Sequence, residues 1–247
     1  DTVGTVGLYV KYAGDPNATA PKSRHLVIGG NGEVGSALAS VLGIVYEVEV
    51  KDLAPKDIKP GFDVMHIALN YAYLGGTNAE RTERFNRIVH EYFQQYRPRY
   101  VDICSTVPPG TTANLGLPAV HSTTRGLHPN LDSSLRTFVK FVAGPSEVAQ
   151  AVAASYEKAG VRCRVFNRSE TTELAHPLSN AYYGSQLLFA DEMAVLCRHF
   201  GVDYADAVTA YNMAHNEGYE KLDHKSKFRP ILYPPGGNIA GHCVQSG

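Results

Sequence analysis

The stretch His25-Leu-Val-Ile-Gly-Gly-Asn-Gly-Glu-Val-Gly35 decides the fold of this 247-residue chain. Its short apolar run ends in glycines, a pattern that predicts a buried strand over residues 25–29. Apolar residues at helical spacing follow the glycines, namely Val34, Leu38, Val41 and Leu42. We therefore expect a strand, a glycine-rich turn and a helix in direct succession.

The turn itself matches the pattern G-x-G-x-x-G. Gly30 permits a tight turn, Gly32 lets the backbone approach a pyrophosphate, and Gly35 allows the helix to pack closely on the strand. The N-terminus of the following helix also favours an anion. A lone match is weak, but the flanking strand and helix supply the context that dinucleotide binding requires. The residues expected to bind the dinucleotide are Gly30, Asn31, Gly32, Glu33, Val34 and Gly35. The alternative is a tight turn that binds nothing.

An acidic residue at the end of the second strand would hold the ribose hydroxyls of a dinucleotide. The second strand is predicted over residues 45–51, and Asp52 follows it, 17 positions after Gly35. Glu49 is the second choice, and a solvated surface charge is the alternative interpretation of either acid. The acid favours NAD, but the adjacent Lys51 weakens that preference, so NADP is not excluded.

Strands and helices alternate along the first two thirds of the chain, which is typical of a parallel sheet covered by helices. Further strands are predicted at residues 63–69, 100–104, 137–143 and 161–166, and helices at 78–97 and 147–159. After Asn167 only helices are predicted, at 169–200, where Pro177 is a potential kink, and at 204–222. We expect an α/β fold: a lead-in at 1–24, a Rossmann-type parallel sheet at 25–167, and a mainly helical second domain at 168–247 that ends in a glycine-rich tail.

Composition argues against several classes of function. A net charge of -1 gives no reason to expect binding to nucleic acid or to an anionic membrane. No apolar run reaches the ~18 residues of a membrane span, and the first residues show no signal-peptide pattern. The four cysteines form no C-x-x-C pair and the histidines no ligand cluster, so we expect no disulfide framework, no metal site and a reducing, cytoplasmic environment.

Three later segments carry motifs in a fixed order: Cys104-Ser-Thr-Val-Pro-Pro-Gly-Thr-Thr112, Glu173-Leu-Ala-His-Pro-Leu-Ser-Asn-Ala-Tyr-Tyr183 and Ala240-Gly-His-Cys243. With the glycine turn, they make the chain resemble the UDP-glucose/GDP-mannose dehydrogenase family, within the wider 6-phosphogluconate-dehydrogenase-like group. The first is similar to the family's S-T-V-x-P-G-T loop beside the nicotinamide. The second is similar to its E-L-x-K-x-x-x-N helix, and the third to the G-G-x-C around its catalytic thiol.

The resemblance implies an NAD-dependent enzyme that oxidises an alcohol on a small or nucleotide-linked anionic substrate. Cys243 would be the nucleophile of a second oxidation that passes through a thioester. His176 stands where the family has its lysine and would accept the hydroxyl proton, assisted by Asn180. Ser105 and Thr106 would line the nicotinamide site. In families of this kind the long helix often forms a dimer interface, so we expect a homodimer.

The chain departs from the family pattern at four points. His176 replaces the lysine, beside Pro177, and no acid occurs four residues after Cys243. The family's C-terminal nucleotide-sugar domain is absent, which suggests a truncated member, and the segment between the second and third strands is shorter. Two alternatives therefore stay open. One is a degenerate member that binds a dinucleotide without turnover, as a sensor or interaction module. The other is a simple two-electron hydroxy-acid dehydrogenase or reductase in which Cys243 has no role.

The segment His121-Ser-Thr-Thr-Arg-Gly-Leu-His-Pro-Asn130 has no clear counterpart in the family. It falls where the family's substrate-facing loop after the fifth strand should lie. Arginine suits bidentate contact with a carboxylate or phosphate. We therefore expect Arg125 and His128 to bind an anionic small-molecule substrate.

Overall fold

The computed structural model of the chain describes residues 23–235, and these form a seven-stranded sheet in the order β2-β1-β3-β4-β5-β6-β7. The strands are β1 (Arg24–Ile28), β2 (Glu47–Lys51), β3 (Phe62–Ile67), β4 (Pro98–Ile103), β5 (Ala119–His121), β6 (Lys140–Ala143) and β7 (Cys163–Phe166). Strands β1 to β5 are parallel, and β6 and β7 are parallel to each other. The expected Rossmann-type α/β sheet is therefore confirmed.

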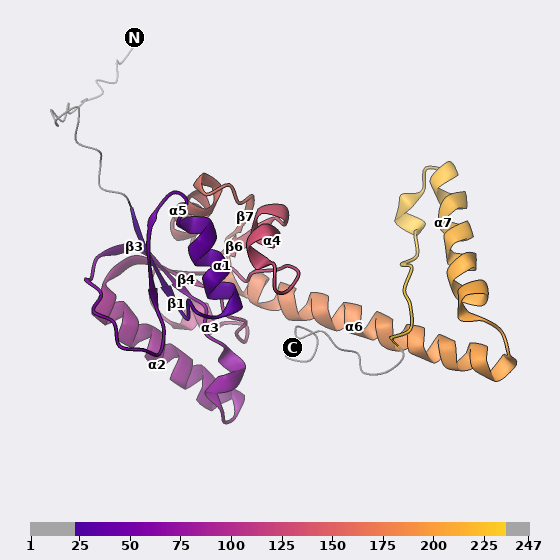
Figure 1. Cartoon of the computed structure of the whole chain (residues 1–247), viewed down its shortest axis with the longest axis horizontal. Helices are drawn as coiled ribbons and strands as arrows, with labels where there is room; N and C mark the ends of the chain where they lie inside the picture. The colour runs from indigo at the N-terminus through magenta and orange to yellow at the C-terminus, as the bar shows by residue number, and fades with distance from the viewer. Residues whose placement is uncertain (1–22, 236–247) are drawn as a thin grey trace, which may run out of the picture.

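Helices cover both faces of the sheet (Figure 1). They are α1 (Glu33–Leu42), α2 (Asn78–Tyr96), α3 (Thr111–Asn114), α4 (Leu131–Thr137), α5 (Ser146–Lys158), α6 (Ser169–Phe200) and α7 (Tyr211–Lys221), with short 3-10 turns at Tyr71–Leu74 and Lys225–Lys227. Apolar residues of α1, α4 and α5 form one core with the sheet. Residues of α2, such as Phe85 and Val89, form the core on the other face. An apolar core thus lies on each face of the sheet, as expected of parallel strands between helices.

One junction of the sheet differs from the prediction, because β6 runs antiparallel to β5. The strand predicted at 137–143 begins three residues later, at Lys140, because Thr137 is the last residue of the helix α4 (Leu131–Thr137). Leu131 and Leu135, one helical turn apart, are both buried in the core. The residues that follow have a strand pattern, and the sequence analysis therefore did not predict this short helix. Strand β5 has only three residues and escaped prediction for that reason.

Helix α6 begins at Ser169 and ends at Phe200, as predicted, and it continues through Pro177. Its first turn is buried against the sheet, including Thr172 and Glu173, whereas its later turns project away from the sheet (Figure 1). The helix predicted at 204–222 consists of a π-helical turn at Ala205–Ala210 followed by α7. No helix among residues 23–235 is long and apolar enough to cross a membrane. The division into two domains after Asn167 stays a prediction.

Two histidines of the sheet are buried and neutral. The ring of His25 stacks on Tyr46 with centroids 4.2 Å apart, and its Nδ1 lies 3.0 Å from Nε2 of His66. Burial, with a smaller contribution from His66, lowers the pKa of His25 to about 3. Burial also lowers the pKa of His121 to about 4. Neither imidazole gains a proton in the folded chain until the pH is strongly acidic.

We expect the folded chain to lose stability as the pH falls from 7 to 5. Between pH 6.5 and the lowered pKa values of His25 and His121, about 3 and about 4, the unfolded chain binds more protons than the folded chain. Each histidine then costs about 2 kcal/mol of unfolding free energy at pH 5. In urea unfolding, His25→Gln should flatten this pH dependence, because glutamine cannot be protonated. An unchanged slope in the variant would show that His25 is not held neutral.

Candidate active site

The glycine turn leads from β1 into α1, and two of its glycines are required by close packing. A Cβ on Gly35 would overlap the carbonyl oxygen of Gly29, and one on Gly30 would overlap the side chain of Val50. At Gly32 a Cβ would meet only the Gly29 oxygen, at 3.4 Å, and the backbone there has an ordinary φ of -77°. The fold therefore does not require glycine at position 32. The missing side chain instead leaves room beside the N-terminus of α1.

Asp52 lies against this turn, as the sequence suggested. Its Oδ2 accepts a hydrogen bond from the backbone N–H of Asn31 (3.0 Å), and its Oδ1 accepts one from Leu53 (2.8 Å). These bonds, that from Asn31 first, lower the pKa of Asp52, so the side chain is an anion. The neighbouring Lys51 donates to the backbone carbonyls of Asp52 and Ala54. The ammonium of Lys51 is thus hydrogen-bonded to backbone carbonyl oxygens next to the turn.

The loop that follows β4 is fastened to α6 by Glu173. This carboxylate is 1% exposed and accepts the backbone N–H groups of Gly110 (2.6 Å) and Thr112 (2.9 Å), at the start of α3. Sequence reasoning assigned Glu173 no such role. In the same loop Ser105 is buried, and its hydroxyl donates to the carbonyl of Ile67. Ser105 therefore joins the ends of β3 and β4, whereas Thr106 is exposed.

A pocket of about 220 Å³ lies between the loop after β5 and the first turns of α6. Its lining includes four residues that the sequence singled out: Arg125, His128, His176 and Asn180. Thr106 adjoins it, because its Oγ1 lies 3.4 Å from Nδ1 of His176. The structure thus gathers the proposed catalytic helix, the proposed substrate loop and the motif loop after β4 around one cavity.

Arg125 and His176 determine the charge of this pocket. The guanidinium of Arg125 donates to the carbonyl of Val139 (2.8 Å) and lies 4.8 Å from the ring centroid of Phe141. Burial, and then the charge of Arg125, lower the pKa of His176, so its imidazole is neutral near pH 7 and can accept a proton.

Two residues that the sequence assigned to different ligands are in contact with each other. Nδ1 of His128, expected at the substrate, pairs with Oε2 of Glu33, expected at the dinucleotide. Glu33 is the first residue of α1, so this pair joins the pocket loop to the glycine turn. Cys243 falls outside the described residues, and its catalytic role stays a prediction.

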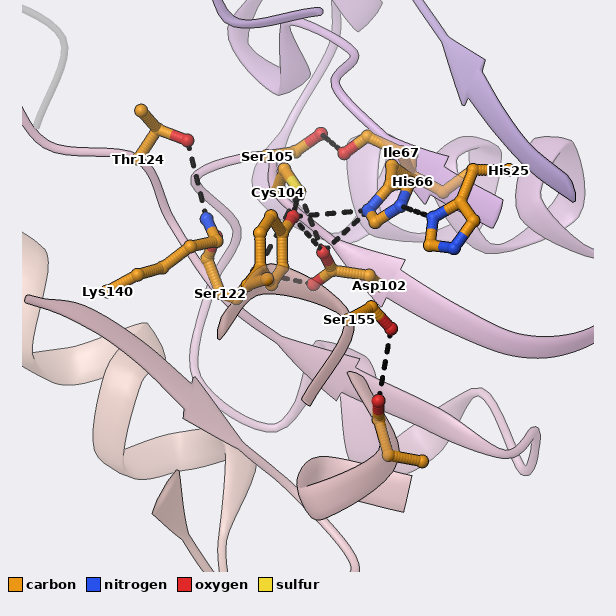
Figure 2. A network of polar contacts seen from close by, with 12 residues as sticks. His25, His66, Ile67, Asp102, Cys104, Ser105, Ser122, Thr124, Lys140 and Ser155 are labelled. Atoms are coloured by element: carbon orange, nitrogen blue, oxygen red, sulfur yellow. Dashed lines mark hydrogen bonds and ion pairs between the residues drawn. The ribbon is translucent and has the colours of Figure 1, made fainter. Parts of the chain in front are cut away.

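Sequence reasoning missed a buried polar network in the middle of the sheet (Figure 2). Oδ2 of Asp102 accepts hydrogen bonds from the hydroxyl of Tyr156 (2.6 Å) and from Nδ1 of His66 (2.8 Å), and Oδ1 accepts the hydroxyl of Ser122. Burial would raise the pKa of Asp102, but the hydrogen bond and charge of His66, with the charge of Lys140, outweigh it and lower that pKa. The sequence feature that could have revealed this network is the presence of charged residues within otherwise apolar strand patterns.

This network contains a group with metal-ligand chemistry that the sequence did not reveal. Donor atoms of His66, Asp102 and Cys104 all lie within 4.8 Å of one another. The register that pairs His66 with Asp102 on adjacent strands brings them together. Protein hydrogen bonds already occupy the carboxylate, and burial raises the pKa of the Cys104 thiol to about 12, so the group is a hydrogen-bonded core cluster.

Comparisons with known proteins agree with this fold. No protein-family model matches the chain. A UDP-N-acetyl-D-mannosamine dehydrogenase from Pyrococcus horikoshii is 26% identical over 177 residues, which cover 66% of this chain and 39% of that protein. The solved structure of a UDP-D-ManNAc dehydrogenase from Pyrococcus horikoshii has a TM-score of 0.66 at 19% identity, covering 90% of this chain and 62% of that one.

A smaller enzyme has a similar fold. A 3-hydroxyisobutyrate dehydrogenase from Mycobacterium tuberculosis matches with a TM-score of 0.61 at 14% identity, covering 79% of this chain and 70% of that one. The chain spans 39% of the curated relative that it matches in sequence. In its sequence and its fold, the chain is similar to nucleotide-sugar dehydrogenases of this kind.

Proposed function

We propose that the chain is an NAD-dependent oxidoreductase that oxidises an alcohol on a small or nucleotide-linked anionic substrate. The observation that carries this proposal is the pocket that gathers Arg125, His176 and Asn180 beside Thr106. Strands β1, β4 and β5 are parallel, so the glycine turn and the two loops leave the same edge of the sheet. The carboxyl edge is where folds of this type bind dinucleotides and substrates.

The proposed dinucleotide site has two parts on this edge. The open backbone at Gly32 and the N-terminus of α1 suit the pyrophosphate, and the ionised Asp52 suits the ribose hydroxyls. An anion at Asp52 would repel the additional phosphate of NADP. The ammonium of Lys51 already donates to backbone carbonyl oxygens, so it would compensate little for the repulsion between Asp52 and that phosphate. We therefore propose NAD as the preferred cofactor.

Residues that line the pocket would carry out proton transfer, orientation of the alcohol and binding of the anionic group. Bound NAD would accept the hydride that leaves the alcohol carbon. His176, which is neutral, would accept the hydroxyl proton, so that the carbon–oxygen single bond becomes a carbonyl. Asn180, one helical turn further along α6, would orient the alcohol, and Arg125 would bind the anionic part of the substrate.

We expect Gly32→Ala to leave the stability of the chain nearly unchanged and to weaken NAD binding by at least about tenfold. The added Cβ meets no protein atom closer than 3.4 Å, but it would occupy the space proposed for the pyrophosphate. Calorimetric titration with NAD, together with thermal unfolding, measures both effects. Ser40→Ala, at an exposed position of the same helix, is the matched control. Equal NAD affinity in Gly32→Ala and the wild type would exclude the turn as the cofactor site.

A second candidate is a two-electron hydroxy-acid dehydrogenase. The pocket of about 220 Å³ suits a small hydroxy acid, and the fold is also that of a 3-hydroxyisobutyrate dehydrogenase. The two chemistries differ in stoichiometry. Four-electron oxidation through Cys243 should yield two NADH for each alcohol consumed and should stop at one or none in Cys243→Ser. Two-electron oxidation should yield one NADH in both proteins. NAD binding without NADH formation from any alcohol would indicate the degenerate member instead.

We also propose that α6 pairs with a second copy of the chain. Its projecting turns expose large apolar side chains, including Tyr182 (67% exposed), Phe189 (65%) and Phe200 (72%). Light scattering should report a mass of twice 26.8 kDa. Phe189→Glu should lower it toward the monomer, because a carboxylate would be buried in the interface, whereas Gln95→Glu, at an exposed position of α2, serves as a charge control. A monomeric wild type at tens of micromolar would contradict the dimer.

A further inference from the structure

Lys140 carries a buried charge in the wall behind the pocket. It is the first residue of β6 and is 4% exposed. Its ammonium donates to the backbone carbonyl of Ser122 (2.6 Å) and lies 4.8 Å from the ring centroid of Tyr156. The hydroxyl of Ser122 in turn donates to Asp102. Lys140 and Asp102 are thus buried opposite charges connected through one serine, and their attraction partly offsets the cost of burying each charge.

The same ammonium reaches one residue of the pocket, as Figure 2 shows. Nζ of Lys140 lies 3.5 Å from Oγ1 of Thr124, and an ammonium can only donate. Within residues 23–235, Oγ1 of Thr124 forms no other hydrogen bond. The hydroxyl of Thr124 therefore accepts from Lys140, and its own hydrogen must point away from the ammonium.

The pocket is the larger space open to that hydrogen. Thr124 lines both the pocket of about 220 Å³ and a separate cavity of about 10 Å³, whereas Lys140 lines only the small cavity. Arg125, the next residue, also lines the pocket and uses one of its five N–H bonds on the carbonyl of Val139. The hydroxyl of Thr124 and the remaining N–H bonds of Arg125 make neighbouring donors, next to a positive charge, on one wall.

We propose that Lys140, anchored by Asp102, is a positioning residue that fixes the hydroxyl of Thr124 as a hydrogen-bond donor into the pocket. Thr124 and Arg125 together then bind an oxyanion of the substrate, a carboxylate or a phosphate group. A hydroxyl that accepts from a cation is a stronger donor, and donors of this kind suit an anionic oxygen. This inference rests on the proposed function, because it takes the pocket to be the substrate site.

The first test compares two substitutions at Thr124. Inorganic phosphate and 3-hydroxypropionate are titrated separately, with and without NADH, and binding is followed by NMR. Thr124→Val keeps the shape of the side chain but loses the donor, and it should weaken binding by about tenfold. Thr124→Ser keeps the hydroxyl and should bind nearly as the wild type. The probe that binds more tightly identifies the oxyanion, and equal affinity of Thr124→Val and the wild type for both probes overturns the proposal.

The second test is a double-mutant cycle with Lys140→Met. If Lys140 acts through Thr124, Lys140→Met should also weaken probe binding, and the double variant should bind no more weakly than Thr124→Val alone. Additive losses would overturn the positioning role. If thermal unfolding shows that Lys140→Met does not fold, the Thr124 pair decides alone. NADH binding without binding of either probe to the wild type rejects this inference, whereas failure to bind NADH rejects the proposed function.

Discussion

Two hydrogen bonds that the carboxylate of Glu173 accepts hold the candidate site together, because they fix α6 to the loop that follows β4. A buried carboxylate is costly unless its oxygens are paired, and here the N–H groups of Gly110 and Thr112 pair both. Helical geometry then decides the rest. His176 and Asn180 follow three and seven residues later, so they lie on the same face of α6 as Glu173. That anchor directs both of them to the pocket, although most of the helix projects from the sheet.

The buried polar network has a structural task at the weakest junction of the sheet. Strands β5 and β6 share a single register pair, His121 with Ala143. Lys140 on β6 and Ser122, directly after β5, add a bond across this junction, and Asp102 extends it to β4. A buried network of this kind stabilises only when its members are satisfied. The same bonds that secure β6 therefore also fix the start of the pocket loop.

Local pattern predicted the parts of the fold that depend on neighbours in sequence. The glycine turn, and the bounds of α6 at Ser169 and Phe200, follow from turn chemistry and helical spacing. The direction of β6 does not, because periodicity is the same for parallel and antiparallel strands. The network around Asp102 depends on the register of β3 with β4. Arg125 and His176 could each be identified from the sequence as candidate site residues. Only the tertiary structure, however, shows that both line one pocket.

His176, which stands where the family that the chain resembles has a lysine, changes the charge balance of the pocket. A lysine at position 176 would add a second cation beside Arg125, whereas His176 is neutral because burial and Arg125 lower its pKa. An oxyanion bound at Arg125 would offset the guanidinium charge and so raise the pKa of His176 toward its ordinary value. In the proposed reaction, substrate binding would then make His176 a stronger base. Burial and Arg125 thus keep the imidazole free of a proton beforehand, and a bound anion would remove the part of that effect that Arg125 contributes.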